Sequence, residues 1–264
     1  MIKIFFYNYV QKLLNFFNLK ISRLYSPYKI SFEDILSLSN NMKTSQLSNL
    51  EYSFIQHLLE NFKNSRSEKF QDLFADWIMS KKRGYFIEFG CCDGLYLSNT
   101  YFLETYRKWK GILIEPSKFY HKKLIKNRPS CIIDFRCVHS VSGENLQFYE
   151  NKYLYNIKKN IKNSYKVGTV TLNDIFYENN LSSVDFLSID TDGTEYEIIK
   201  NFDFKIFKVK ILVIEHNYNK YFRKSTADLL KKNNYINLFK DISGHDDWFV
   251  LKEVFDNKCK QISK

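Results

Sequence analysis

Between positions 85 and 217, short runs of apolar residues alternate with longer amphipathic stretches. Each run is almost continuously apolar and ends in polar or small residues, which is typical of parallel strands buried on both faces. The predicted strands are residues 85–89, 110–115, 131–138, 184–189 and 210–217. A sheet of such strands needs helices on both of its faces.

The amphipathic stretches supply those helices. Their apolar residues recur at helical spacing over residues 31–40, 51–61, 67–81, 95–107 and 195–201. Strands that alternate with helices indicate an α/β fold with a mostly parallel sheet. With three prolines, eight glycines and no internal repeat, the chain shows no convincing linker. We predict an N-terminal helical region over residues 1–65 and one α/β domain over residues 66–264.

The first 25 residues contain many aromatic side chains, but lysine, asparagine and glutamine interrupt them. No run approaches the roughly 18 to 20 apolar residues of a membrane-spanning helix, and no signal-peptide cleavage site follows. The apolar spacing predicts an amphipathic helix that packs on the domain or on a second subunit of a homodimer. Peripheral contact with a membrane is the alternative.

The turn Gly90-Cys91-Cys92-Asp93-Gly94 follows the first predicted strand. Ligands of open α/β sheets bind at the carboxyl ends of the strands, so this turn is a candidate cofactor site. It lacks the G-x-G-x-x-G spacing of a dinucleotide site, and the charge of Asp93 disfavours a pyrophosphate. A cationic, amine-bearing ligand such as S-adenosylmethionine fits better. Glu115 ends the second strand, where a carboxylate can hold two ribose hydroxyls.

Acidic residues end four of the predicted strands, at Glu88, Glu115, Asp190 and Glu215. Four carboxylates at one edge of a sheet indicate a site. Asp190 with His216 can provide a general base, and Asp190, Glu215 and His216 can bind Mg²⁺, Mn²⁺ or Fe²⁺. The structural alternative is that the two acids cap helices or loops while the histidine packs.

Charge and cysteine content narrow the setting of the protein. The formal net charge of +11 is spread along the chain, which suits acidic partners such as nucleotide-sugars, glycans or anionic lipid. We expect no nucleic-acid partner, because no ordered platform of aromatic and basic residues is present. Five cysteines without a C-x-x-C motif favour reduced thiols. The predicted location is the cytoplasm, with membrane contact through the N-terminal helix as the alternative.

Four blocks of sequence resemble the FkbM-type S-adenosylmethionine-dependent methyltransferases. They are FIEFGCCDGLYLSNTYFLE with WKGILIEP, VTLNDIF, VDFLSIDTDGTEYEIIKNFDF and ILVIEHN, over residues 84–217. The resemblance implies a Rossmann-like class I methyltransferase fold, with seven mostly parallel strands and one antiparallel edge strand. It also implies a set of residues around the cofactor: Glu88, Gly90, Asp93, Gly94, Ser98 and Asn99 beside the methionine part, Glu115 at the ribose and Val138 near adenine.

The predicted function is O-methylation of a sugar or nucleotide-sugar hydroxyl in surface-polysaccharide assembly, such as capsule or lipopolysaccharide. Two alternatives stay open. Asp190 and Asp192 follow an apolar strand, as do the nucleophile and general acid of haloacid-dehalogenase-like phosphatases, although that strand normally opens the domain. The other alternative is a non-catalytic binding module on a methyltransferase fold.

Overall fold

A seven-stranded sheet forms the centre of the computed structural model, which describes residues 48–80, 83–150, 163–240 and 243–263. Its strand order is β3-β2-β1-β7-β8-β10-β9, and β10 alone runs in the direction opposite to the other six strands. The strands are β1 (Tyr85–Phe89), β2 (Lys110–Ile114), β3 (Ile132–Asp134), β7 (Ser183–Ile189), β8 (Lys208–Glu215), β9 (Tyr235–Leu238) and β10 (Asp246–Leu251). The mostly parallel seven-stranded sheet is thus confirmed.

The reversed strand is not at the edge of the sheet, and this part of the expectation was wrong. β10 pairs with β8 on one side and with β9 on the other. Its residues Trp248, Phe249 and Val250 are almost fully buried. A strand that is apolar on both faces gains more from a central place than from an exposed edge.

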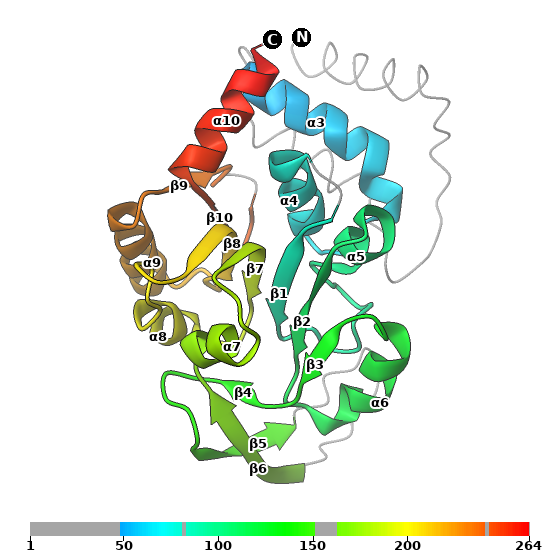
Figure 1. Cartoon of the computed structure of the whole chain (residues 1–264), viewed down its shortest axis with the longest axis vertical. Helices are drawn as coiled ribbons and strands as arrows, with labels where there is room; N and C mark the ends of the chain where they lie inside the picture. Colours follow the sequence, from blue (N-terminus) through cyan, green and yellow to red (C-terminus); the bar gives the residue numbers. More distant parts are fainter. Residues whose placement is uncertain (1–47, 81–82, 151–162, 241–242, 264) are drawn as a thin grey trace.

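Helices cover both faces of the sheet (Figure 1). Alternate strand residues enter two separate cores, so Phe86 faces one and Ile87 the other. The first core includes residues of α3 (Asn49–Asn61), α4 (Gln71–Met79), α5 (Tyr101–Arg107), α6 (Lys118–Asn127) and α10 (Lys252–Ile262); the second includes residues of α7 (Leu172–Glu178), α8 (Glu195–Lys200) and α9 (Lys220–Lys232). The fold is a three-layer α/β/α sandwich.

The predicted helix at 51–61 is confirmed as α3, which begins with a capping box between Ser48 and Glu51. Its Phe54 packs on Trp77 of α4 and stacks on Phe239, with ring centroids 5.0 and 4.9 Å apart. This helix of the predicted N-terminal region therefore belongs to the core around the sheet, and a short 3-10 helix, η1 (Phe62–Asn64), follows it. The domain boundary at residue 65 stays a prediction.

The predicted amphipathic N-terminal helix and the predicted helix at 31–40 lie outside the described residues. Within the described part of the chain, no helix is long and apolar enough to cross a membrane.

A second, three-stranded sheet has the order β4-β6-β5, with β4 (Cys137–Val138), β5 (Asn145–Glu150) and β6 (Asn163–Val170). The strand predicted at 131–138 is divided into two: β3 belongs to the large sheet and β4 to the small one. The backbone N–H of Arg136 donates to the Asp134 carboxylate at 2.9 Å, which turns the chain between them.

Two predicted helices are shorter than expected. The helix predicted at 67–81 is α4, which begins only after Phe70, whose φ is 66°. The helix predicted at 95–107 is α5, which begins at Tyr101. The loop before Tyr101 belongs to the candidate site and is described with it.

Candidate active site

The turn after β1 lies directly against the end of β7. Gly90 has a φ of +69°, and a Cβ at this position would lie 2.2 Å from the Asp190 carbonyl oxygen. Gly94 has a φ of +76°, and a Cβ there would lie 2.5 Å from Cγ of Arg128. Both positions therefore require glycine for conformation and for space. The turn brings the predicted cofactor site and Asp190 together.

Glu115 is held at the end of β2, beside this turn. Its two carboxylate oxygens accept hydrogen bonds from the backbone N–H groups of Cys92 and Ser117, both at 2.8 Å. The side chain is buried. A buried carboxylate fixed by backbone donors is a preorganised acceptor for ligand hydroxyl groups. The structure thus brings Glu115 to the turn, as the sequence predicted.

Glu88 and Ser98 belong to a buried hydrogen-bond network beneath the turn. The Glu88 carboxylate accepts from the Ser98 hydroxyl at 3.1 Å, from the Asn99 backbone N–H at 2.7 Å and from the Thr100 hydroxyl. These bonds take the place of helical ones, which explains why α5 begins only at Tyr101. Burial raises the pKa of Glu88, although the Arg128 guanidinium acts in the opposite direction.

Arg128 completes this network, although nothing in the sequence pointed to it. It is 1% exposed, and it donates to the Ser98 and Thr100 hydroxyls and to the Gly94 carbonyl, each at 3.0 Å. It also pairs with Glu104. A lone arginine after a helix carries no motif, so only the folded chain could reveal it.

Asn99 offers a fit for the cofactor's ammonium group. Its amide Nδ2 donates to the Ser188 hydroxyl of β7 at 2.9 Å, so the side chain lies between the ends of β1 and β7. Its Oδ1 is buried and accepts no hydrogen bond from the part of the chain that is described. A buried acceptor without a donor is costly, and a bound ammonium group would satisfy it.

The remaining predicted cofactor residues have structural tasks in this conformation. Oδ1 of Asp93 accepts from the backbone N–H groups of Leu95 and Tyr96, at 3.0 and 2.8 Å, and so shapes the turn. Val138 is 3% exposed and packs in the second core. Its place near adenine stays a prediction.

Three carboxylates meet where β7 and β8 end. These strands are parallel, with Ile189 opposite Ile214, so Asp190 and Glu215 follow at neighbouring positions. One carboxylate oxygen each from Asp190, Glu195 and Glu215 lies within 4.8 Å of the others. Glu195 is anchored, because its Oε1 accepts the backbone N–H groups of Thr191 and Gly193, both at 2.9 Å.

Asp190 and Glu215 form a pair of interacting carboxyl groups. Asp190 is exposed, and its carboxyl group lies against Glu215 at the strand ends. Desolvation there, together with the charge of Glu215, raises the pKa of Asp190 well above its usual range. Desolvation also raises the pKa of Glu215. Two adjacent carboxylates resist ionising together, so they titrate as a pair.

His216 does not join this cluster. Its Nδ1 accepts the backbone N–H of Tyr218 at 3.0 Å, so the ring proton is on Nε2, which donates to the Asp246 carbonyl at 3.2 Å. Burial lowers the pKa of the ring. Both ring nitrogens are thus engaged in this conformation, and Glu195 rather than His216 lies beside Asp190 and Glu215; the predicted role of His216 as a base or metal ligand stays a prediction.

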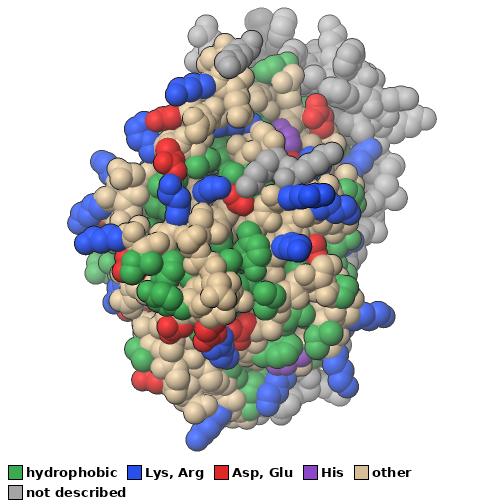
Figure 2. Space-filling model, viewed as in Figure 1, with side chains coloured by type: hydrophobic (Ala, Val, Ile, Leu, Met, Phe, Trp, Pro, Cys, Tyr) green, Lys and Arg blue, Asp and Glu red, His purple; other side chains and the backbone are tan. Residues whose placement is uncertain are grey.

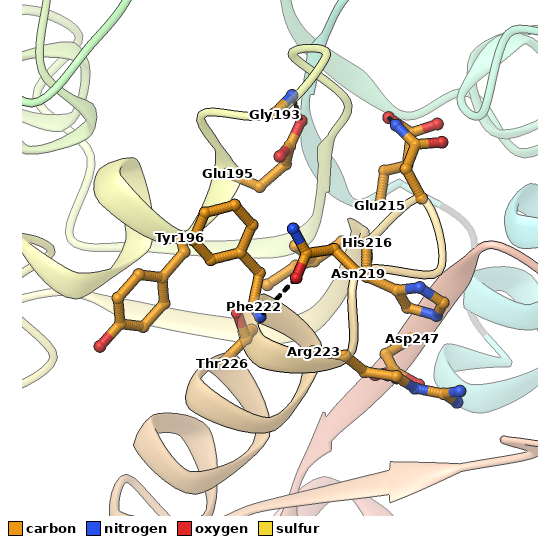
Figure 3. A pocket seen from close by; sticks show the side chains of 12 residues that line it. Gly193, Glu195, Tyr196, Glu215, His216, Asn219, Phe222, Arg223, Thr226 and Asp247 are labelled. Atoms are coloured by element: carbon orange, nitrogen blue, oxygen red, sulfur yellow. Dashed lines mark hydrogen bonds and ion pairs between the residues drawn. The ribbon is translucent and has the colours of Figure 1, made fainter.

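A pocket opens between α8 and α9, beside Glu215. Its volume is about 470 Å³, counted out into the open solvent at its mouth. Figure 3 shows the Tyr196 and Phe222 rings on one side, while the His216 ring points away from them. These two rings are nearly parallel, with centroids 6.3 Å apart. At the base, Arg223 forms an ion pair with the buried Asp247 at 2.8 Å. The pocket thus combines an aromatic wall with fixed polar groups.

Lysine and arginine side chains are scattered over the face in Figure 2 and form no single basic patch there. This agrees with the spread of charge along the sequence.

The strand order with its one reversed strand, the glycine turn after β1 and the acid at the end of β2 define a class I Rossmann-like methyltransferase. A family model described as "Methyltransferase FkbM domain" matches residues 88–249. The chain belongs to this family of S-adenosylmethionine-dependent methyltransferases. No curated protein matches the chain significantly.

Several solved methyltransferase structures are similar at low sequence identity. The methyltransferase domain of METTL16 is 11% identical, with 81% of this chain and 87% of that chain covered and a TM-score of 0.42. TrmK of M. capricolum, solved with S-adenosyl-homocysteine, is 12% identical, with 67% and 66% covered and a TM-score of 0.37. Fibrillarin of Methanococcus jannaschii is 16% identical, with 64% and 66% covered and a TM-score of 0.37. This chain therefore spans just under two thirds of the last two proteins.

Proposed function

We propose that the protein transfers a methyl group from S-adenosylmethionine to a hydroxyl of a sugar or nucleotide-sugar during assembly of a surface polysaccharide such as capsule or lipopolysaccharide. The position of Asp190 carries this proposal. Its backbone lies against the turn at Gly90, and its carboxyl group lies against Glu215, which lines the pocket. Asp190 is therefore placed between the predicted cofactor site and the candidate acceptor site.

Methyl transfer to a hydroxyl requires alignment of the acceptor and removal of its proton. The bound cofactor supplies an electrophilic methyl group on a sulfonium. On the protein side, Glu115 orients the ribose, and Asn99 accepts from the ammonium group. Asp190, the member of the carboxyl pair nearer the Gly90 turn, accepts the proton of the acceptor hydroxyl, and the charge of Glu215 beside it raises the pKa of Asp190 toward that task.

The pocket beside Glu215 suits a sugar ring. The Tyr196 and Phe222 rings offer an apolar wall to the C–H face of a sugar. Asn219 and the Arg223–Asp247 pair offer fixed polar groups to its hydroxyls. The family and the basic charge of the chain also favour an acidic sugar derivative, such as a nucleotide-sugar.

The direct test is methyl transfer from labelled S-adenosylmethionine to a panel of nucleotide-sugars by wild type, Asp190→Asn and Asp192→Asn. We expect Asp190→Asn to lower kcat by about 100-fold or more, because general-base catalysis is typically worth that much. Asp192→Asn should keep kcat within about threefold. Asp192 is exposed and has a φ of 57°, a conformation that asparagine also adopts readily.

The same experiment, with its wild-type arm, tests the two alternatives. A phosphatase would need both Asp190 and Asp192, so equal loss in the two variants, with release of phosphate by wild type, would contradict methyl transfer. A non-catalytic binding module would bind S-adenosyl-homocysteine but methylate nothing in the panel.

A divalent metal is a second candidate means of activating the hydroxyl. The structure brings Asp190, Glu195 and Glu215 together in place of the predicted set with His216. An all-carboxylate set suits Mg²⁺ or Mn²⁺ better than Fe²⁺. If a metal acts here, EDTA should lower turnover at least tenfold and Mg²⁺ or Mn²⁺ should restore it. Unchanged turnover in EDTA would exclude a catalytic metal, and the carboxyl pair would then be the base.

A cytoplasmic location, a homodimer, membrane contact through the N-terminal helix and the absence of a nucleic-acid partner stay predictions.

A further inference from the structure

The turn between β8 and α9 has an unusual backbone. Asn217 and Tyr218 have φ values of 44° and 59°, so two successive residues other than glycine adopt the left-handed conformation. Such a conformation is unfavourable for a bulky residue such as tyrosine, and it persists only where the surroundings fix it. Strained backbone of this kind concentrates at ligand-binding sites.

His216 is the main support of this turn. Its Nδ1 accepts the Tyr218 backbone N–H at 3.0 Å, and its carbonyl accepts the Asn219 N–H at 2.7 Å. The ring itself is held by the Asp246 carbonyl. The neighbouring Asn217 amide donates to the Glu215 carboxylate at 2.7 Å, and this bond connects the turn to the Asp190–Glu215 carboxyl pair.

The supported turn presents aromatic side chains to solvent. Tyr218 is 71% exposed and Tyr221 is 72% exposed. Neither ring belongs to the core, and the Tyr218 ring contacts only the edge of the His216 ring among the ring contacts of the described residues, with centroids 5.9 Å apart. The same segment contributes Asn217, Asn219 and Phe222 to the pocket wall, so each tyrosine is next in sequence to a residue that lines the pocket.

The charge of this segment favours an anionic ligand. Between residues 217 and 224 it contains Lys220, Lys224 and Arg223 and no acidic residue, although Arg223 is paired with Asp247. Lys220 and Lys224 are exposed. Exposed aromatic rings stack on nucleobases and on sugar rings, while lysine side chains attract phosphate groups.

We propose that the turn at Asn217–Tyr218, held by His216, forms a binding platform for the nucleoside diphosphate part of a nucleotide-sugar acceptor, with Tyr218 as its stacking residue. This inference rests on the proposed function. It makes His216 a positioning residue, which acts through the turn and does not touch the reacting atoms. The sugar then enters the pocket beside Tyr196, while the diphosphate stays at the basic edge.

The test uses the full chain with saturating S-adenosyl-homocysteine and measures binding of UDP-glucose, UDP-N-acetylglucosamine and GDP-mannose by saturation-transfer NMR and calorimetry. Tyr218→Ala should weaken binding of the preferred nucleotide-sugar at least fivefold and leave S-adenosyl-homocysteine affinity unchanged. Tyr149→Ala is the matched control, because Tyr149 is 70% exposed and belongs to β5 of the other sheet. It should change neither affinity.

A second pair of variants tests the positioning role of His216. His216→Ala removes the acceptor of the Tyr218 N–H and should weaken nucleotide-sugar binding as Tyr218→Ala does. His216→Asn retains an acceptor oxygen near the position of Nδ1 and should restore most of that affinity. A general loss of structure would not be rescued in this way.

Two results would overturn the inference. One is a wild type that binds S-adenosyl-homocysteine but none of the three nucleotide-sugars; the other is equal nucleotide-sugar affinity in wild type and Tyr218→Ala. Both would leave the methyltransferase proposal intact. A wild type that fails to bind S-adenosyl-homocysteine would overturn the proposed function as well.

Discussion

Glu88 illustrates what can be foreseen for a single residue. An acid at the end of an apolar strand predicts a site, and the structure does place Glu88 beneath the glycine turn. The resemblance to the family placed Ser98 near Glu88, but Thr100 and Arg128 could not be foreseen as partners, because Thr100 comes from a loop that was expected to be helical and Arg128 follows α6. The burial of an acidic side chain and its hydrogen-bond partners decide whether it binds a ligand itself or supports other ligand-binding residues.

Asp72 allows a prediction at this scale. Its carboxylate is buried and accepts from the Ser65 and Ser67 hydroxyls at 2.6 and 2.8 Å. Burial raises its pKa from 3.8 to about 6. The folded state therefore favours the protonated form, and the resulting stability is complete below pH 3.8 and is lost as the pH rises through 6.

Asp72→Asn removes this titration. Between pH 3.5 and 7 the free energy of unfolding of wild type should fall by about 3 kcal/mol relative to the variant. Urea denaturation of both proteins across this range measures the difference. A difference that stays constant with pH would show that Asp72 titrates normally.

At the scale of elements, the apolar runs were sufficient for the parallel strands. β1, β2, β7 and β8 lie where the continuous apolar runs predicted them. Helix starts were less predictable, because α4 and α5 begin late where buried acids capture nearby hydroxyl and N–H groups. Such competition comes from side chains 7 and 11 positions away, outside the spacing of one helical turn, so the helical periodicity does not reveal it.

The turn between β8 and α9 is a second example. Asn217 and Tyr218 have left-handed conformations, and no glycine at these positions could have predicted them. His216 supports them, although the sequence predicted it as a base and a metal ligand. A histidine at a strand end is equally compatible with all three roles, and only its two hydrogen bonds distinguish them.

At the scale of the whole molecule, the strand order creates the candidate site. β1 lies between β2 and β7, and β8 follows β7, so Glu115, the glycine turn, Asp190 and Glu215 follow successive neighbouring strands. The resemblance to the family predicted the seven-stranded, mostly parallel sheet but put the reversed strand at its edge, and the local pattern cannot specify which strands are neighbours. The pocket between α8 and α9 could not be predicted, because its walls depend on how two helices pack.

The most direct measurement of the central claim is calorimetric titration of the full chain with S-adenosyl-homocysteine. We predict one site per chain, with affinity at least tenfold weaker in Glu115→Gln, because hydrogen bonds to a charged acceptor contribute about 1.5–3 kcal/mol. Glu253→Gln, on the exposed side of α10, should bind as wild type does. Absence of binding by wild type, or equal affinity in Glu115→Gln and wild type, would contradict the account.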